Sequence, residues 1–138
     1  MTWTRIIAVA ALAVVPLIVG AGVARQGARA QQPGIKRTDL QRHPLSAPGR
    51  EVIQTRVELA PGTSFGRHWH PGEEIIYVLE GSLQYQIEDR PWVTVKAGDV
   101  LFVPARTIHA ARNIGSVPGA ELATYIVETG QPLLVPAQ

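Results

Sequence analysis

The chain has 138 residues, of which 46% are hydrophobic and none is cysteine, a length that fits one compact domain. The absence of cysteine excludes a disulfide framework and thiolate metal ligands. The formal net charge is +2, but residues 1–30 hold three arginines and no acid, so ten basic and eleven acidic side chains remain beyond them, a net charge of −1. That balance gives no case for nucleic-acid binding.

The first thirty residues have the layout of a secretory signal peptide. Arg5 precedes an apolar run over residues 6–24, and small residues at Ala28 and Ala30 offer a cleavage site. We therefore predict a signal peptide over residues 1–30 and an exported protein, which is periplasmic or secreted if the source is bacterial. In the alternative, the run of 19 residues is kept and tethers the protein to the membrane, because that length can cross a bilayer.

The rest of the chain has the pattern of a β-domain. Residues 31–49 are polar and rich in turn formers, and we interpret them as an N-terminal arm or linker. Residues 50–130 contain short alternating apolar runs between Gly/Pro turns, and residues 131–138 are interpreted as a C-terminal tail. Strands spaced about 8–12 residues apart, without a helical period, predict an all-β sandwich or barrel. The first of these strands should place four side chains on one face: Ile53, Thr55, Val57 and Leu59.

Three of the four histidines form a pattern that points to metal chemistry. His68 and His70 are two residues apart, so on a strand both side chains point to the same face. Glu74 and His109 follow. Imidazole and carboxylate groups are ligands of first-row transition metals, so the sequence predicts a metal held inside a β-structure. The fourth, His43, lies in the arm, where an exposed position is favoured over a role as a fifth site residue.

Two spaced motifs resemble those of the cupin superfamily. The first has the spacing G-x5-H-x-H-x3-E-x6-G and falls at Gly62, His68, His70, Glu74 and Gly81. The second, G-x5-P-x-G-x2-H-x3-N, matches at Gly98, Pro104, His109 and Asn113. It departs at Arg106, where a glycine is usual. Sixteen residues separate the motifs, as in small single-domain cupins.

The resemblance implies a double-stranded β-helix, the jelly-roll barrel of the cupins. It also implies that His68, His70, Glu74 and His109 converge inside this barrel on one divalent transition metal, Fe, Mn, Zn or Ni. Four protein ligands would leave two positions of an octahedral ion open, as a catalytic site needs. Glu74 would then tune the metal or act as a catalytic base.

Arg106 replaces the usual glycine of the second motif and adds a positive charge there. A glycine at this position permits a positive φ in the turn before the third histidine, and an arginine must adopt that conformation at a cost or reshape the turn. Its place two residues after Pro104 puts it near the mouth of the barrel. We hypothesise that its guanidinium binds an anionic group of the substrate. The alternative is a solvated loop cation.

The sequence supports more than one function. The favoured prediction is an exported metal-dependent enzyme on a small molecule, of the dioxygenase or the isomerase, lyase or decarboxylase type. The alternatives are a non-catalytic cupin that binds a small ligand or carbohydrate, and a jelly roll that uses the metal for stability alone. The resemblance also implies a homodimer, paired through a sheet edge or an N-terminal strand.

Overall fold

The structure is a computed structural model that describes residues 32–137. The predicted signal peptide, and the membrane tether that is its alternative, lie outside the described residues. No helix long and apolar enough to cross a membrane occurs within residues 32–137. Ten strands make up the described chain: β1 (Ile35–Pro44), β2 (Arg50–Leu59), β3 (Ser64–Trp69), β4 (Gly72–Glu80), β5 (Ser82–Ile87), β6 (Val93–Lys96), β7 (Val100–Val103), β8 (His109–Arg112), β9 (Gly119–Glu128) and β10 (Val135–Pro136).

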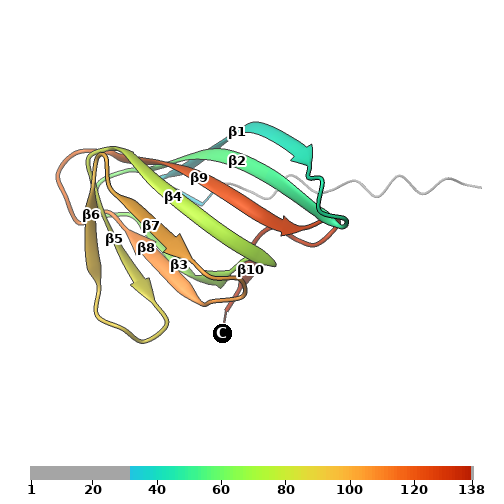
Figure 1. Cartoon of the computed structure of the whole chain (residues 1–138). Helices are drawn as coiled ribbons and strands as arrows, with labels where there is room; N and C mark the ends of the chain where they lie inside the picture. Colours follow the sequence, from blue (N-terminus) through green and yellow to red (C-terminus); the bar gives the residue numbers. More distant parts are fainter. Residues whose placement is uncertain (1–31, 138) are drawn as a thin grey trace, which may run out of the picture.

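The strands form two five-stranded antiparallel sheets that face each other (Figure 1). Sheet A has the order β1-β2-β9-β4-β7, and sheet B has the order β10-β3-β8-β5-β6. Strands that are neighbours in a sheet are often distant in the chain, because the connections cross from one sheet to the other. This is the double-sheet jelly roll that the sequence predicted.

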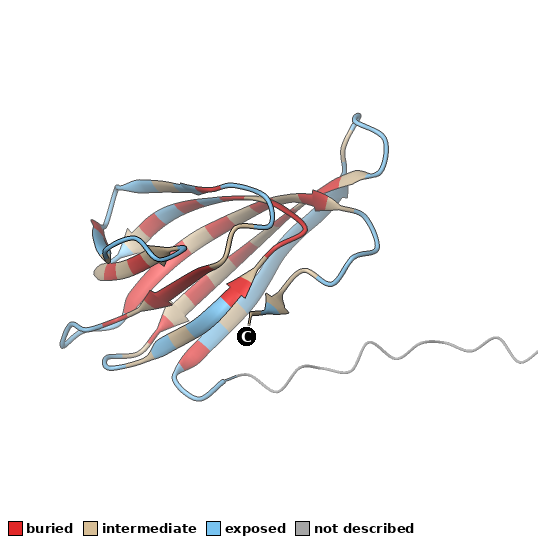
Figure 2. Ribbon diagram, turned by 90° about the horizontal axis from the view of Figure 1, so that it is seen from below, coloured by how far each residue is buried: buried red, intermediate tan, exposed pale blue. Residues whose placement is uncertain are grey.

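Alternation of side chains along the strands builds the core between the sheets. On β2 every second residue is buried, including Ile53, Val57 and Leu59. Strands β4 and β9 alternate in the same way, which gives the banded strands of Figure 2. Each fully buried aliphatic side chain contributes about 1.5–3 kcal/mol relative to an exposed one. The predicted inward face of this strand is confirmed.

The segment that the sequence suggested as an arm is instead largely strand β1. It pairs antiparallel with β2, with Ile35 opposite Leu59 at one end and Pro44 opposite Glu51 at the other. Ile35 is the one buried residue of this edge strand, so backbone pairing rather than an apolar pattern forms it. The predicted tail likewise holds β10, which pairs with β3. His43 is exposed, as expected.

Candidate metal centre

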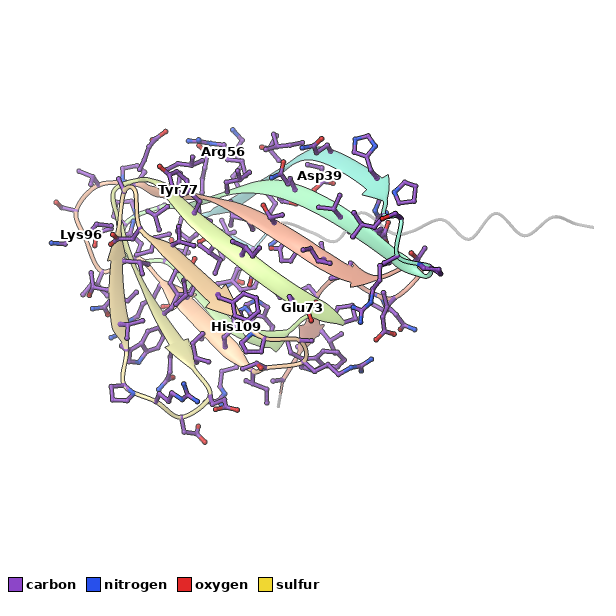
Figure 3. All side chains as sticks on the ribbon, viewed as in Figure 1. Asp39, Arg56, Glu73, Tyr77, Lys96 and His109 are labelled. Carbon is purple, nitrogen blue, oxygen red and sulfur yellow. The ribbon has the colours of Figure 1, made fainter. Side chains whose placement is uncertain are left out.

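The three motif histidines come together inside the barrel from neighbouring strands of sheet B. His68 lies on β3 and is directly opposite His109 on β8, and His70 follows the end of β3. Their ligand atoms all lie within 4.8 Å of one another. The three side chains are buried, and Figure 3 shows His109 between the two layers.

The fourth polar group of the cluster comes from the opposite sheet. Glu74 lies on the inward face of β4 and is 3% exposed. Its Oε2 atom is 3.0 Å from His109 Nε2 and 3.4 Å from His70 Nε2. Gly72 brings β4 close to β9 here, because a Cβ atom at this position would collide with the Ile126 carbonyl. The four predicted ligands therefore lie side by side.

Backbone carbonyls fix the orientation and tautomer of every histidine in the cluster. His68 Nδ1 is 2.7 Å from the Gly66 carbonyl oxygen, and His109 Nδ1 is 2.9 Å from that of Thr107. His70 Nδ1 is 2.6 Å from the carbonyl oxygen of Leu133. A carbonyl oxygen only accepts hydrogen bonds, so each Nδ1 atom carries a proton and donates it. In the neutral imidazole, Nε2 then carries a free lone pair, the arrangement of metal-binding histidines.

The atoms that face the centre of the cluster lack partners. His70 Nε2 and Glu74 Oε2 are buried without a hydrogen bond, which is costly for polar atoms. Two lone pairs at 3.0–3.4 Å need a proton or a cation between them. Three imidazoles and a carboxylate are a donor set for a divalent transition metal, so the residues present fit such an ion.

Electrostatics favours the protonation states that a metal needs. Burial, with a contribution from His109, lowers the pKa of His68 to about 3, so its imidazole is neutral. Burial raises the pKa of Glu74, but its contacts with His109 and His70 outweigh burial and hold that pKa below the ordinary value of 4.5. Neutral imidazole and ionised carboxylate are the metal-binding forms.

Sequence reasoning missed a second group of polar side chains that line the cavity at the cluster. The cavity has a volume of about 20 Å³, and its polar walls include Arg37, Tyr85, Glu121 and Tyr125 in addition to the cluster. Arg37 Nη2 donates a hydrogen bond to the Tyr125 hydroxyl at 3.2 Å. The buried Tyr85 hydroxyl and Glu121 Oε2 have no hydrogen-bond partner. Burial, helped by the Glu74 charge, raises the pKa of Glu121, so its carboxyl stays protonated above its ordinary range.

Arg106 lies outside this cavity. It adopts the positive φ of the missing glycine, at 59°, and its backbone N–H donates to the His70 carbonyl at 3.0 Å. Its guanidinium lies 2.9 Å from Glu128 Oε1 and 5.6 Å from the Trp69 ring centroid. The residues around the cluster cavity do not include it. Its contact with a substrate stays a prediction.

Asn113, the last residue of the second motif, has a structural position. It is 1% exposed, and its side-chain amide donates to the backbone carbonyls of Leu59 and Val117 at 3.0 and 2.8 Å. Its Oδ1 atom accepts from the Gly115 N–H at 2.9 Å. These bonds hold the loop between β8 and β9 against the end of β2.

The comparison with protein families gives the same class as the fold and the cluster. The model of the cupin domain matches residues 55–125, which include both motifs. The chain belongs to the cupin family.

Curated relatives resemble the chain over part of its length. An oxalate-binding protein of Thermotoga maritima is 38% identical over 73 residues, which are 52% of this chain and 60% of that protein. Germin-like protein 1 of Brassica napus is 33% identical over 82 residues, 56% of this chain and 40% of the relative. The chain thus spans 60% or less of the length of these relatives.

Solved structures share the fold. DMSP lyase DddQ from Ruegeria pomeroyi has a TM-score of 0.58 and 26% identity, over 62% of this chain and 43% of the lyase. Oxalate decarboxylase of Bacillus subtilis has a TM-score of 0.51 and 27% identity, over 56% of this chain and 22% of that chain. A double-stranded β-helix protein from Klebsiella pneumoniae has a TM-score of 0.63 at 18% identity, over 79% of this chain and 90% of that one, which is a likeness of fold alone.

Proposed function

We propose that this protein is a metal-dependent enzyme that acts on a small organic acid. The observation that carries the proposal is the pairing of an unsatisfied His–Glu cluster with the cationic side chain of Arg37 in one small cavity. His68, His70 and His109 would hold a divalent metal through Nε2, together with Glu74. When bound, such an ion supplies Lewis-acid activation through its open positions.

The charge of the cavity supports an anionic substrate. The imidazoles are neutral when Nδ1 alone carries a proton, Arg37 contributes +1 and Glu74 contributes −1. A divalent ion would therefore leave a net charge of +2, which a small dianion balances. Two similar proteins, an oxalate-binding protein and oxalate decarboxylase, are named for a ligand of the same class.

The remaining cavity residues supply positioning and proton-donating groups. The Tyr125 hydroxyl accepts a bond from Arg37, so its own hydrogen is available to a ligand oxygen. The protonated carboxyl of Glu121 offers a second donor with no partner of its own. The cavity, of about 20 Å³, has room for about one water molecule, so a bound acid would have to widen it. Such donors suit a lyase or decarboxylase, in which a developing carbanion or leaving group takes up a proton.

The proposal is tested with metal analysis and one matched pair of variants. The purified chain should retain close to one divalent metal, and His109→Ala should lose it. Oxalate, as the probe acid, should bind about 10- to 100-fold more weakly to Arg37→Leu than to the unaltered protein, since a hydrogen bond to a charged group contributes about 1.5–3 kcal/mol. Arg42→Leu, which removes a cation of the same strand outside the cavity, is the control. Equal affinity in Arg37→Leu, or no metal uptake at all, would refute the proposal.

A non-catalytic acid-binding protein is the second candidate. The 38% identity to an oxalate-binding protein favours it, because that name records binding rather than turnover. Turnover separates the two: ¹³C-labelled oxalate incubated with the metal-loaded protein should give labelled products if the protein is an enzyme of this acid. Saturable binding without product would support the binding protein.

Export is proposed on the sequence pattern of residues 1–30. Sequencing of the mature N-terminus in the producing cell tests it. A first residue at Gln31 supports cleavage and export, whereas an intact Met1 in the membrane fraction supports the tether.

A further inference from the structure

Two adjoining clefts lie where the β5–β6 loop (residues 88–92) meets the β7–β8 loop (residues 104–108). Figure 1 shows both loops at the lower side of the molecule. The clefts have volumes of about 510 and 330 Å³, and they are continuous because Glu88, Arg90 and Thr107 line both. Volumes of roughly 300–1,000 Å³ are typical of small-molecule sites. We call the pair the loop cleft, and it shares no lining residue with the cavity at the metal cluster.

Arginines dominate the larger part of the loop cleft. Its charged lining consists of three arginines and two acids: Arg67, Arg90, Arg106, Glu88 and Asp89. Each guanidinium is paired with one exposed carboxylate, and Arg106 takes its partner, Glu128, from outside the lining. A guanidinium has five N–H donors, so it can hold a surface carboxylate and a ligand anion at the same time. Exposed ion pairs also contribute little to stability, so a ligand can displace them at low cost.

The smaller part of the loop cleft is mainly apolar. Its apolar lining has six residues: Ile87, Pro91, Val93, Leu101, Phe102 and Pro104. Ile87 and Leu101 are half-buried and pack against the core, whereas Val93 is 45% and Phe102 is 55% exposed. An apolar ligand group would remove these side chains from water, which is favourable. The lining of this part therefore suits a hydrocarbon chain or ring.

The backbone holds the arginine-lined part in a fixed shape. Within residues 32–137, the non-glycine residues with positive φ are Glu88 at 53° and Arg106 at 59°, and both line this part. The Glu88 N–H donates to the Ile108 carbonyl at 2.7 Å, and the Arg106 N–H donates to the His70 carbonyl at 3.0 Å. Residues held in such unfavourable conformations are concentrated at ligand-binding sites. Loops fixed in this way lose little further freedom when a ligand binds.

We infer that the loop cleft binds an apolar monocarboxylic acid as a second ligand, outside the metal cavity. The carboxylate would lie at the arginines, because guanidinium groups bind carboxylates through two parallel hydrogen bonds. The hydrocarbon part would lie in the apolar part of the cleft. This ligand differs from the small acid proposed for the cavity at the cluster, so the inference does not depend on the proposed function.

Isothermal titration calorimetry of the purified full chain with octanoate tests the inference. Octanoate should bind saturably at one site. Arg67→Gln/Arg90→Gln should weaken this binding about 10-fold or more, since hydrogen bonds to charged groups are lost. The matched control is Lys36→Gln/Lys96→Gln, which removes two exposed cations outside the cleft and should bind octanoate as the unaltered protein does.

A second pair of variants tests the apolar part. Phe102→Ser should weaken octanoate binding about 3- to 10-fold, because less apolar surface is buried. Val117→Ser, at a side chain that is 59% exposed outside the cleft, should have no effect. Octanoate that does not saturate the protein, or that binds the arginine and Phe102 variants as tightly as the unaltered protein, would overturn the inference.

Two further probes identify the head group of the ligand. 1-Octanol has the same hydrocarbon chain without a carboxylate and should bind about 10-fold more weakly than octanoate. Equal binding of the alcohol would remove the role of the arginines. Octyl phosphate that binds more tightly than octanoate would overturn the assignment to a carboxylic acid.

The place of binding is tested without relying on the cleft variants. His109→Ala should bind octanoate with the affinity of the unaltered protein, because the cleft and the cluster share no lining residue. In ¹⁵N–¹H spectra of the unaltered protein, octanoate should shift the amide signals of residues 87–91 and 104–108 most. Loss of binding in His109→Ala, or shifts centred on Arg37 and Tyr125, would place the acid in the metal cavity and overturn the inference.

Discussion

Removal of the C-terminal segment should weaken metal binding although that segment contains no metal ligand. The Leu133 carbonyl accepts the hydrogen bond of His70 Nδ1 at 2.6 Å, and the segment is held by β10, which pairs with β3. A chain ending at Gly130 leaves His70 free to rotate and to carry its proton on Nε2. Loss of such a partner usually lowers metal affinity 10- to 100-fold, which is about 1.4–2.7 kcal/mol.

The control for this prediction separates the carbonyl from the side chain. Leu133 packs against the core, so the shortened chain also loses an apolar contact. Leu133→Ala removes that contact but keeps the carbonyl. It should lower the free energy of unfolding by about 1–2 kcal/mol, because the side chain is only partly buried, and leave metal affinity close to that of the unaltered protein.

The assay has two readouts. Competition with a chromophoric chelator gives the zinc affinity of the three proteins. ¹⁵N chemical shifts of the imidazoles in the metal-free proteins report which nitrogen of His70 carries the proton. The shortened chain should show a mixture of tautomers, and Leu133→Ala should show the Nδ1–H form. Unchanged affinity in the shortened chain, or an equal loss in Leu133→Ala, would refute the reasoning.

Three further outcomes follow from burial and backbone contact. The pKa of His68 falls from 6.5 to about 3 on folding, so the metal-free protein should lose stability as pH falls from 6.5 towards 3, by up to about 1.4 kcal/mol per pH unit; urea titrations at several pH values should show a shallower slope for His68→Gln. Glu121 has a raised pKa in the folded state, so its contribution to stability is present below about pH 4.5 and is lost as the pH rises. The stability of Glu121→Gln minus that of the unaltered protein should therefore be larger at pH 8 than at pH 5. A difference that does not change with pH would contradict this. Gly72→Ala should lower the urea midpoint by the equivalent of about 1–3 kcal/mol or prevent folding, because its Cβ would meet the Ile126 backbone, whereas Gly66→Ala, with open space around it, should have little effect.

The part of the site that the sequence could predict is the part encoded by spacing. His68 on β3 and His70 directly after its end are two residues apart and are both buried, as the spacing predicted. The two motifs together identified the family that the comparison confirmed. The alternation on β2 likewise predicted its inward face. These features depend on the spacing of residues along a single strand or motif, which can be read from one sequence.

The missed residues depend on which face of a strand meets the cavity. On β9 the inward positions include Glu121 and Tyr125, while the apolar Leu122 and Ile126 point outward. Both faces of this strand carry apolar side chains, so a period of two does not tell inside from outside. Arg37 lies on β1, an edge strand formed by backbone pairing with almost no apolar signal. The Leu133 carbonyl is a backbone group, which every residue carries, so no residue type in the sequence marks it as a partner of His70.

Because the cluster takes its histidines from sheet B and Glu74 from sheet A, a bound metal should join the two sheets and raise stability. Free metal at 100 times its dissociation constant adds about 2.7 kcal/mol, which for a domain of this size is a rise of roughly 10–20 °C in melting temperature. Differential scanning calorimetry with and without zinc measures the shift, and chelation should reverse it. Glu74→Gln keeps the shape of the side chain but removes the charge, so its metal-induced shift should be smaller. An equal melting temperature with and without zinc would show that the cluster does not bind the ion, or that the ion binds the unfolded chain equally well.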